Sequence, residues 1–371
     1  MSVRVSYKKQ FLVYVFLFLI LATVIEIGSR IYEYKLSRCA LLDSASYATI
    51  DELLKEKICN DSNKLVYEKP NITILQPNQH YDTINVNSFG FRGNEISKEK
   101  QGDIYRIFIV GGSTVFGAGA TSDENTISGF LQKIFDKERN FSDDIKHVEV
   151  INAGVPGANS VREYYYIKNT LLEFQPDMIV IYDGLNDADN AIINKNDLGK
   201  APENELINIR TDFDHMISKY FQIYRTPFVL NYIIFKSTTE ISYNINSIEQ
   251  MKQNWHDRWE DICKNGDSKN IKVVITLQPI LGTGNKTLYF DEITKAKSIE
   301  SQVTVKAINE LELPLHQLSD TCLTYDLRGV FDDVKEPIFY DNGHTNVKGN
   351  EIIAKKLFEV VKPVIYKKNS Q

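Results

Sequence analysis

Residues 105–117 read YRIFIVGGSTVFG, an apolar run that ends in two glycines followed by Ser113. Four more short apolar runs follow it along the chain. Runs of this kind are typical of strands that are buried on both faces of a sheet. The five runs are RIFIV ending at Val110, HVEVI ending at Ile151, DMIVIY ending at Tyr182, IKVVIT ending at Thr276 and CLTYDL near Asp326.

Amphipathic segments alternate with these runs, and a last one follows the fifth run. Strand and helix in regular alternation predict right-handed crossovers and a parallel sheet that is covered by helices. We therefore expect a three-layer, doubly wound α/β fold with a five-stranded, flavodoxin-like parallel sheet. The predicted helices are residues 126–137, 161–174, 251–264, 299–311 and 347–361.

The rest of the chain divides around this domain, which we place at residues 101–365. Residues 29–100 are polar, rich in Tyr and Asn and weakly periodic, and they end in VNSFGFRG at 86–93. We interpret them as a stalk and an extended lead-in. Residues 188–248 interrupt the alternation with a polar and aromatic insertion, and a segment of this length usually caps a site.

The N-terminus carries fifteen uncharged residues, FLVYVFLFLILATVI at 11–25, after Arg4, Lys8 and Lys9. No convincing cleavage site follows, so we interpret residues 11–28 as a transmembrane signal anchor and residues 1–10 as a cytoplasmic tail. A cleaved signal peptide and a buried core helix are the alternatives. Basic residues flank the run on both sides, so the charge count alone does not set the orientation.

Charge and cysteine content bear on partners and compartment. The net charge of -6, without a basic stripe, disfavours a nucleic-acid partner. Four cysteines permit two disulfides if the domain lies outside the cytoplasm, and free buried thiols are the alternative. Sequons at Asn60, Asn71, Asn140 and Asn285 also fit an exported domain. Of the three possible pairings, one joins Cys39 with Cys59 and Cys263 with Cys322.

Ligands of open parallel sheets bind beyond the carboxyl ends of the strands, so we expect the functional residues in the segments there. The first segment, GGSTVFG, lacks the third glycine of a dinucleotide site and the lysine of a P-loop. It is not a G-x-S-x-G nucleophile elbow either. The other segments are NAGVPGANS, DGLND, LQPILGTG and FYDNGHTNVKGN.

Taken together, these segments resemble the four blocks of the SGNH/GDSL hydrolase family over roughly residues 86–363. The blocks carry Ser, Gly, Asn and an Asp-x-x-His pair in chain order. Ser113, Gly157 and Asn186 match the first three, and Asp341 and His344 match the last. One departure is visible, because Gly112 stands where the name-giving block has Asp.

The resemblance implies a serine esterase in which Ser113, His344 and Asp341 form a catalytic triad. A serine hydroxyl needs an adjacent imidazole as base, and a carboxylate three residues before that imidazole can orient it locally. The backbone N–H groups of Ser113 and Gly157 and the amide of Asn186 suit an oxyanion hole. Gln278, after the fourth run, is expected to border the substrate pocket.

Each of these residues also has a simpler interpretation. Ser113 could be only a helix N-cap, Gly157 a turn glycine and Asn186 an Asx-turn residue. Asp341 and His344 could be solvated loop residues. The order of all four blocks in one chain favours the enzymatic interpretation.

The function that we expect is hydrolysis of an acyl ester, such as an O-acetylated surface glycan, a lipid or a small ester. An acyltransferase on the same triad is the nearest alternative, and a non-catalytic anchored binding module is a third. We expect no cofactor, and no metal, since the other histidines lack ligand spacing. The chain is expected to be a single-pass membrane protein with its catalytic domain outside the cytoplasm.

Overall fold

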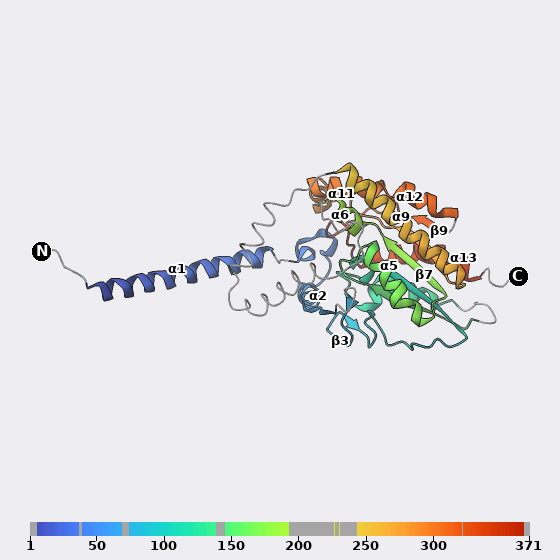
Figure 1. The fold of residues 1–371 in the computed structure, drawn as a ribbon, viewed down its shortest axis with the longest axis horizontal. Helices are drawn as coiled ribbons and strands as arrows, with labels where there is room; N and C mark the ends of the chain where they lie inside the picture. Colours follow the sequence, from blue (N-terminus) through green and yellow to red (C-terminus); the bar gives the residue numbers. More distant parts are fainter. Residues whose placement is uncertain are drawn as a thin grey trace. The chain divides into compact units, whose positions relative to one another are not determined.

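A computed structural model of the chain describes residues 6–36, 39–68, 74–138, 145–192, 226, 230, 243–320 and 322–366, and of residues 32–36 it describes the backbone alone. The chain divides into two compact units. One contains residues 1–39 and 203–240, and the other contains residues 40–202 and 241–371. The predicted sheet domain lies in the second unit (Figure 1).

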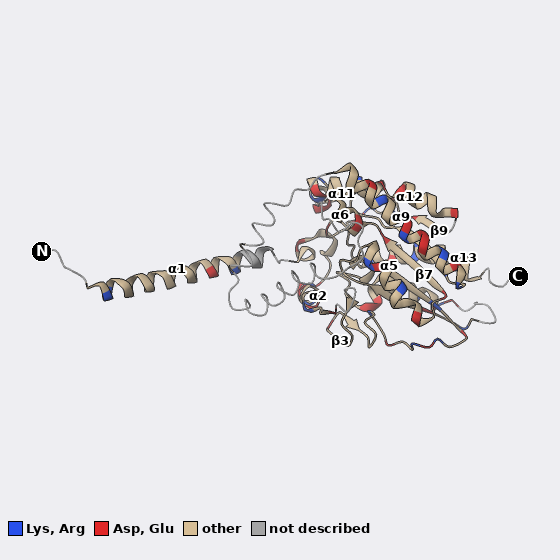
Figure 2. Ribbon diagram, viewed as in Figure 1, with Lys and Arg blue, Asp and Glu red and all other residues tan. Residues whose placement is uncertain are grey.

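The N-terminal unit contains helix α1, Tyr7–Leu36, which includes the predicted anchor at residues 11–28. Between Lys9 and Glu26 the helix carries no charged side chain, as Figure 2 shows. Its segment Tyr7–Ile31 is long and apolar enough to cross a membrane. A signal sequence meets the same criteria, so both interpretations of the N-terminus stay open.

The core of the second unit is a five-stranded parallel sheet, as predicted. Its strand order is β6-β5-β7-β8-β9, so the chain passes from β5 to β6 on one side and then crosses to β7 on the other. This order is that of a doubly wound fold, and it places a switch point between β5 and β7. The strands are β5 Ile104–Gly111, β6 His147–Gly154, β7 Met178–Asp183, β8 Lys272–Leu277 and β9 Leu323–Asp326.

Helices cover both faces of this sheet because successive strand residues point to opposite sides. On β5, Phe108 and Val110 join the core beneath α5, α6, α9, α11 and α12. Ile107 and Ile109 join the core beneath α4 and α13. The five helices predicted from the sequence are present, with ends up to six residues from the expected ones. They are α4 Ile127–Phe135, α5 Ser160–Asn169, α9 Ile245–Ser268, α11 Ile299–Asn309 and α13 Val347–Tyr366. Helices α6 Leu185–Ile192 and α12 Glu312–Gln317 were not predicted.

Residues 40–100 differ from the expected stalk, because they belong to the sheet-containing unit from Ala40 onward. Leu75, Ile84 and Val86 are buried and pack with Phe116, which lies five residues after the end of β5. The sequence did not reveal this packing because each strand in the described part of this region is two residues long. The described elements are 3₁₀ turns at Ala40–Asp43 and Ala45–Tyr47, helix α2 Glu52–Lys64, and strands β1 Tyr67–Glu68, β2 Ile74–Leu75, β3 Gln79–His80 and β4 Asn85–Val86.

The predicted insertion at 188–248 begins inside α6 and ends inside α9. Between these helices the described residues are 226, 230 and 243–244, and the rest of the predicted cap lies outside the described part. Further along, a disulfide joins Cys263 on α9 to Cys322, the residue before β9. Within the described part of the chain, none of the cysteines is free.

Candidate active site

Three of the predicted site loops follow neighbouring strands of the sheet. Ser113 comes two residues after β5, Gly157 three residues after β6, and Asn186 three residues after β7. Because β6, β5 and β7 are adjacent and parallel, their carboxyl ends lie at one edge of the sheet. The loops therefore meet beside the switch point, where ligands of such folds bind.

Ser113 begins a single helical turn, α3 Ser113–Phe116. The turn ends at Gly117, whose φ of 90° lies in the left-handed region that favours glycine. The turn also packs tightly against the next strand. A Cβ added at Gly154 would lie 2.1 Å from the backbone nitrogen of Phe116, so only glycine fits there.

The fourth loop brings Asp341 and His344 to Ser113. His344 Nε2 lies 2.6 Å from Ser113 Oγ. On the other side of the ring, His344 Nδ1 lies 2.7 Å from Asp341 Oδ2. Asp341 Oδ1 accepts hydrogen bonds from the backbone N–H groups of Gly343 (2.9 Å) and His344 (2.7 Å). The carboxylate therefore holds both the ring and the loop that carries the ring.

Buried polar side chains fasten this loop to the rest of the domain. Glu292 is fully buried and accepts hydrogen bonds from the backbone N–H groups of Ile338 (2.8 Å) and Phe339 (3.0 Å). Ser301 donates to Asn342 Oδ1 at 2.6 Å, and Lys295 donates to the carbonyl of Tyr340 at 2.7 Å. Contacts therefore hold the loop on both sides of Asp341.

Aromatic packing fixes the imidazole from a second direction. The Tyr340 ring stacks on the His344 ring at an interplanar angle of 15°, with ring centroids 5.5 Å apart. Tyr47, from residues 40–100 of the sheet-containing unit, packs edge-on against Tyr340 at a centroid distance of 5.5 Å. Its hydroxyl donates to the carbonyl of Gly119 at 2.5 Å. The segment 40–100 therefore contacts the loop that carries His344.

The electrostatics of the three groups favour an oriented, basic imidazole. Burial alone would raise the pKa of Asp341, but the charge and hydrogen bonds of His344 and the backbone N–H groups outweigh it, so that pKa is lowered. Burial alone would lower the pKa of His344. The charge and hydrogen bond of Asp341, together with the charge of Asp189, outweigh burial and raise the pKa of His344.

Gly157 and Asn186, the other predicted oxyanion donors, lie on loops that are linked to each other. Gly157 has a φ of 74°, and the side-chain amide of Asn186 donates to the carbonyl of Ala158 at 2.5 Å. A primary amide has two N–H groups, so this bond leaves one for another acceptor. Asp187 adds a second link, because it accepts hydrogen bonds from Ser160 N (2.8 Å) and Ser160 Oγ (2.5 Å).

The structure also explains the glycine that replaces the aspartate of the name-giving block. A Cβ added at Gly112 would lie 2.4 Å from Asn186 Nδ2 and 3.1 Å from the carbonyl oxygen of Ala158. The contact with Asn186 Nδ2 is too close for a real side chain, and the contact with Ala158 is tight. Any larger residue at 112 must therefore displace Asn186.

Gln278 is the site residue that the geometry does not join to the others. It is 3% exposed at the end of β8, and its backbone N–H donates to the carbonyl of Asp183 at 3.0 Å. Its side-chain nitrogen has no hydrogen-bond partner among the described residues. A contact between Gln278 and substrate stays a prediction.

Asp189 is a polar neighbour of the site that sequence reasoning missed. It lies on α6 and accepts a hydrogen bond from Thr304 Oγ1 at 2.9 Å. Burial, with the nearby charges of Glu300 and Asp341, raises the pKa of Asp189 to about 6. Its position three residues after Asn186 was the available signal, since residues three apart share a helix face.

Comparisons with known proteins identify a family and several similar solved structures. The family model described as GDSL-like Lipase/Acylhydrolase matches residues 107–357. An acetyl xylan esterase is 15% identical with a TM-score of 0.42, covering 69% of this chain and 99% of its own. An acetylxylan esterase from Geobacillus stearothermophilus is 11% identical with a TM-score of 0.39, covering 69% and 94%. No curated protein matches the chain.

The electrostatics predict that removing the charge of Asp189 lowers the pKa of His344. In the wild-type protein that pKa should lie above 6.5, because the carboxylates of Asp341 and Asp189 favour the imidazolium. The Asp189→Asn variant should shift the titration of His344 to lower pH. NMR of histidine ε1 carbons across a pH series measures both values.

The Glu312→Gln variant is the control for this titration. It removes one negative charge from α12, and Glu312 does not contribute to the pKa of His344. A His344 titration that is the same in wild type, Asp189→Asn and Glu312→Gln would contradict the prediction.

Proposed function

The chain belongs to the GDSL-like lipase/acylhydrolase family and hydrolyses ester bonds, and from that premise we propose that Ser113, His344 and Asp341 form its catalytic triad. One observation carries the proposal, namely the continuous chain of contacts from Ser113 Oγ to His344 Nε2 (2.6 Å) and from His344 Nδ1 to Asp341 (2.7 Å). These are the contacts that a serine nucleophile, its base and the orienting carboxylate require.

In the first half of the reaction, Ser113 Oγ attacks the carbonyl carbon of the ester while His344 Nε2 takes the hydroxyl proton. Asp341 stabilises the imidazolium that forms and holds the Nδ1–H tautomer. The tetrahedral intermediate then collapses, the C–O bond to the alcohol breaks, and His344 returns the proton to the departing oxygen. An acyl group remains on Ser113.

Water completes the cycle by the same groups. His344 takes a proton from a water molecule, whose oxygen attacks the acyl carbon and breaks the bond to Ser113 Oγ. The serine oxygen recovers the proton from His344, and the acid leaves.

We also propose that the backbone N–H groups of Ser113 and Gly157 and the free N–H of Asn186 stabilise the oxyanion. The links from Asn186 to Ala158 and from Asp187 to Ser160 support this role, since they fix the two donor loops relative to each other. Donors that are fixed before the reaction need no reorganisation when the negative charge develops.

The substrate that we propose is an acyl ester of a surface glycan. A domain held by α1 at the outer face of a membrane would meet surface polysaccharide. The disulfide between Cys263 and Cys322 supports an oxidising compartment. Release of acetate from an O-acetylated polysaccharide, compared with release of acid from lipid esters, tests the substrate class.

Replacing Ser113 with alanine should abolish covalent labelling by a fluorophosphonate probe and lower ester hydrolysis by about 10⁴-fold or more. The physical reason is the loss of the only oxygen that contacts His344 Nε2 among the described residues. Mass spectrometry of the labelled protein locates the modified residue.

Ser128→Ala is the matched control, because Ser128 is a buried serine on α4 whose Oγ has no partner in the described part of the chain. It should be labelled at the wild-type rate. Labelling of Ser113→Ala at the wild-type rate would exclude Ser113 as the nucleophile, and a wild-type protein that resists labelling would favour a binding module.

Replacing Gly112 with alanine should lower kcat by about 10²- to 10³-fold, the typical cost of losing one oxyanion donor. The added Cβ would collide with Asn186 Nδ2 and displace it. Steady-state kinetics with a chromogenic acetate ester give kcat and KM.

Gly102→Ala is the control, because its added Cβ meets no atom within 4 Å, and we expect wild-type kinetics. A wild-type kcat in Gly112→Ala would contradict the proposed role of Asn186 as an oxyanion donor.

The proposed topology predicts that protease added outside intact cells digests the domain, and that the chain resists carbonate extraction with residues 1–28 still attached. A cleaved signal peptide would instead give a shorter, extractable protein. Immunoblotting and N-terminal sequencing separate these results. Protection of the domain, under conditions that digest a known surface protein, would place it on the cytoplasmic side.

A further inference from the structure

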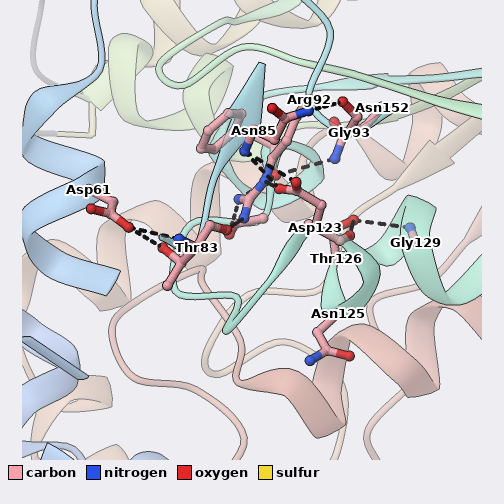
Figure 3. Close-up of polar contacts among 12 residues, drawn as sticks. Asp61, Thr83, Asn85, Arg92, Gly93, Asp123, Asn125, Thr126, Gly129 and Asn152 are labelled. Carbon is pink, nitrogen blue, oxygen red and sulfur yellow. Dashed lines mark hydrogen bonds and ion pairs between the residues drawn. The ribbon is translucent and has the colours of Figure 1, made fainter. Parts of the chain in front are cut away.

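Arg92 lies in the VNSFGFRG segment, outside the residues that the family model matches. It is 4% exposed, although a buried arginine must find partners for a charged group with five N–H donors. Its partners lie on two sides, and Figure 3 shows Asp123 and Thr83 among them. On one side lies the turn that carries Ser113.

Toward that turn, Arg92 Nη1 donates to the carbonyl oxygens of Phe116 (3.1 Å) and Gly117 (2.9 Å). The guanidinium carbon also lies 4.7 Å from the centre of the Phe116 ring. Asn152 reinforces these contacts, because its side-chain nitrogen donates to the carbonyls of Val115 (2.9 Å) and Phe116 (3.3 Å). The last carbonyls of α3, which have no partner within the helix, are therefore satisfied by side chains.

On the other side, Arg92 binds Thr83, from residues 40–100, and Asp123, which lies shortly before α4. Nε donates to Asp123 Oδ1 at 2.7 Å, and Nη2 donates to the carbonyl of Thr83 at 2.7 Å. Thr83 is itself held, since its N–H and Oγ1 donate to Asp61 on α2 at 2.8 and 2.9 Å. The bonds to Asp123 and Thr83 therefore hold the guanidinium in the position from which it contacts α3.

We propose that Arg92 is a positioning residue for Ser113, which acts by holding the carbonyl end of α3 so that the Ser113 hydroxyl and N–H stay aligned. This inference rests on the proposed role of Ser113 as nucleophile. It extends the functional unit to residues 83–93, upstream of the family domain.

Helix α3 is only four residues long. An isolated helix of four residues is not stable in water, so its orientation depends on outside contacts. Ser113 is at one end of the turn, and the bonds from Arg92 are at the other. A displacement of about 1 Å at a reacting group can cost about 10²-fold in rate. A lysine has one ammonium group in place of the planar fork and cannot reach Asp123, Thr83 and both carbonyls together.

Arg106 provides a matched control within the same domain. It is 1% exposed, near the amino end of β5, whereas α3 follows the carboxyl end. Arg106 donates to Glu149 (2.6 Å) and to the carbonyls of Phe174 (2.6 Å) and Ser97 (2.8 Å). Its chemistry matches that of Arg92, but none of these partners belongs to the proposed site.

The test compares Arg92→Lys with Arg106→Lys in the full-length protein. Thermal unfolding should show a lower Tm for both variants, because each loses bonds from a buried guanidinium. Only Arg92→Lys should react more slowly with the fluorophosphonate probe and show a lower kcat, each by about 10- to 100-fold, with KM within about threefold of wild type. In Arg92→Ala, added guanidinium ion at millimolar concentration should restore part of the labelling rate.

Asp123→Asn keeps the inference testable if the Arg92 variants do not fold. It retains the shape of the carboxylate and weakens the anchor of Arg92, so labelling should slow while KM is retained. Wild-type labelling rates in folded Arg92→Lys or Asp123→Asn, or equal loss of activity in Arg92→Lys and Arg106→Lys, would overturn the inference. Absence of labelling in the wild-type protein would instead reject the proposed nucleophile.

Discussion

The contact between Ser113 Oγ and His344 Nε2 is the constraint on which the rest of the site depends. It joins residues 231 positions apart, so no local sequence preference can create it. The parallel sheet brings Ser113 to its edge, and the packing of Ile338 and Phe339 in the core beneath α13 brings the loop of His344 to the same edge. The tolerance of a 2.6 Å contact is a few tenths of an ångström, which apolar packing alone does not guarantee.

Buried polar groups supply the remaining precision. Glu292 binds backbone N–H groups just before Asp341, and Arg92 binds carbonyls just after Ser113. Burying such groups costs free energy unless their partners are complete, and replacement by apolar residues is often neutral for stability. Directional bonds nevertheless fix a loop in one register, which a hydrophobic contact does not. At both halves of the site, these buried groups therefore supply a directional constraint that apolar packing does not.

The parts of the structure that could be predicted are those with a strong sequence pattern. The apolar runs ending near Val110 and Tyr182 identified buried strands because parallel strands are apolar on both faces. The order of four short blocks identified the loops of the candidate site, whose roles stay a proposal. Residues 40–100 had no comparable signal, because side-chain bonds such as those of Arg92 and Asp61 to backbone groups replace regular pairing there. These bonds have no period that a sequence can show, and Asp189 was missed because it was assigned to the insertion.

Gly112 and Arg92 act at opposite ends of α3. At the start of α3, the absence of a side chain at Gly112 leaves room for the amide of Asn186. At its end, a long side chain from outside the family domain occupies the carbonyls. Without Arg92, the carbonyl end of α3 would keep the apolar packing of Phe116 and the hydrogen bonds from Asn152, and it would lose the bonds from the guanidinium. A fragment that begins at residue 101 would therefore retain every family block and still lose a contact that orients Ser113.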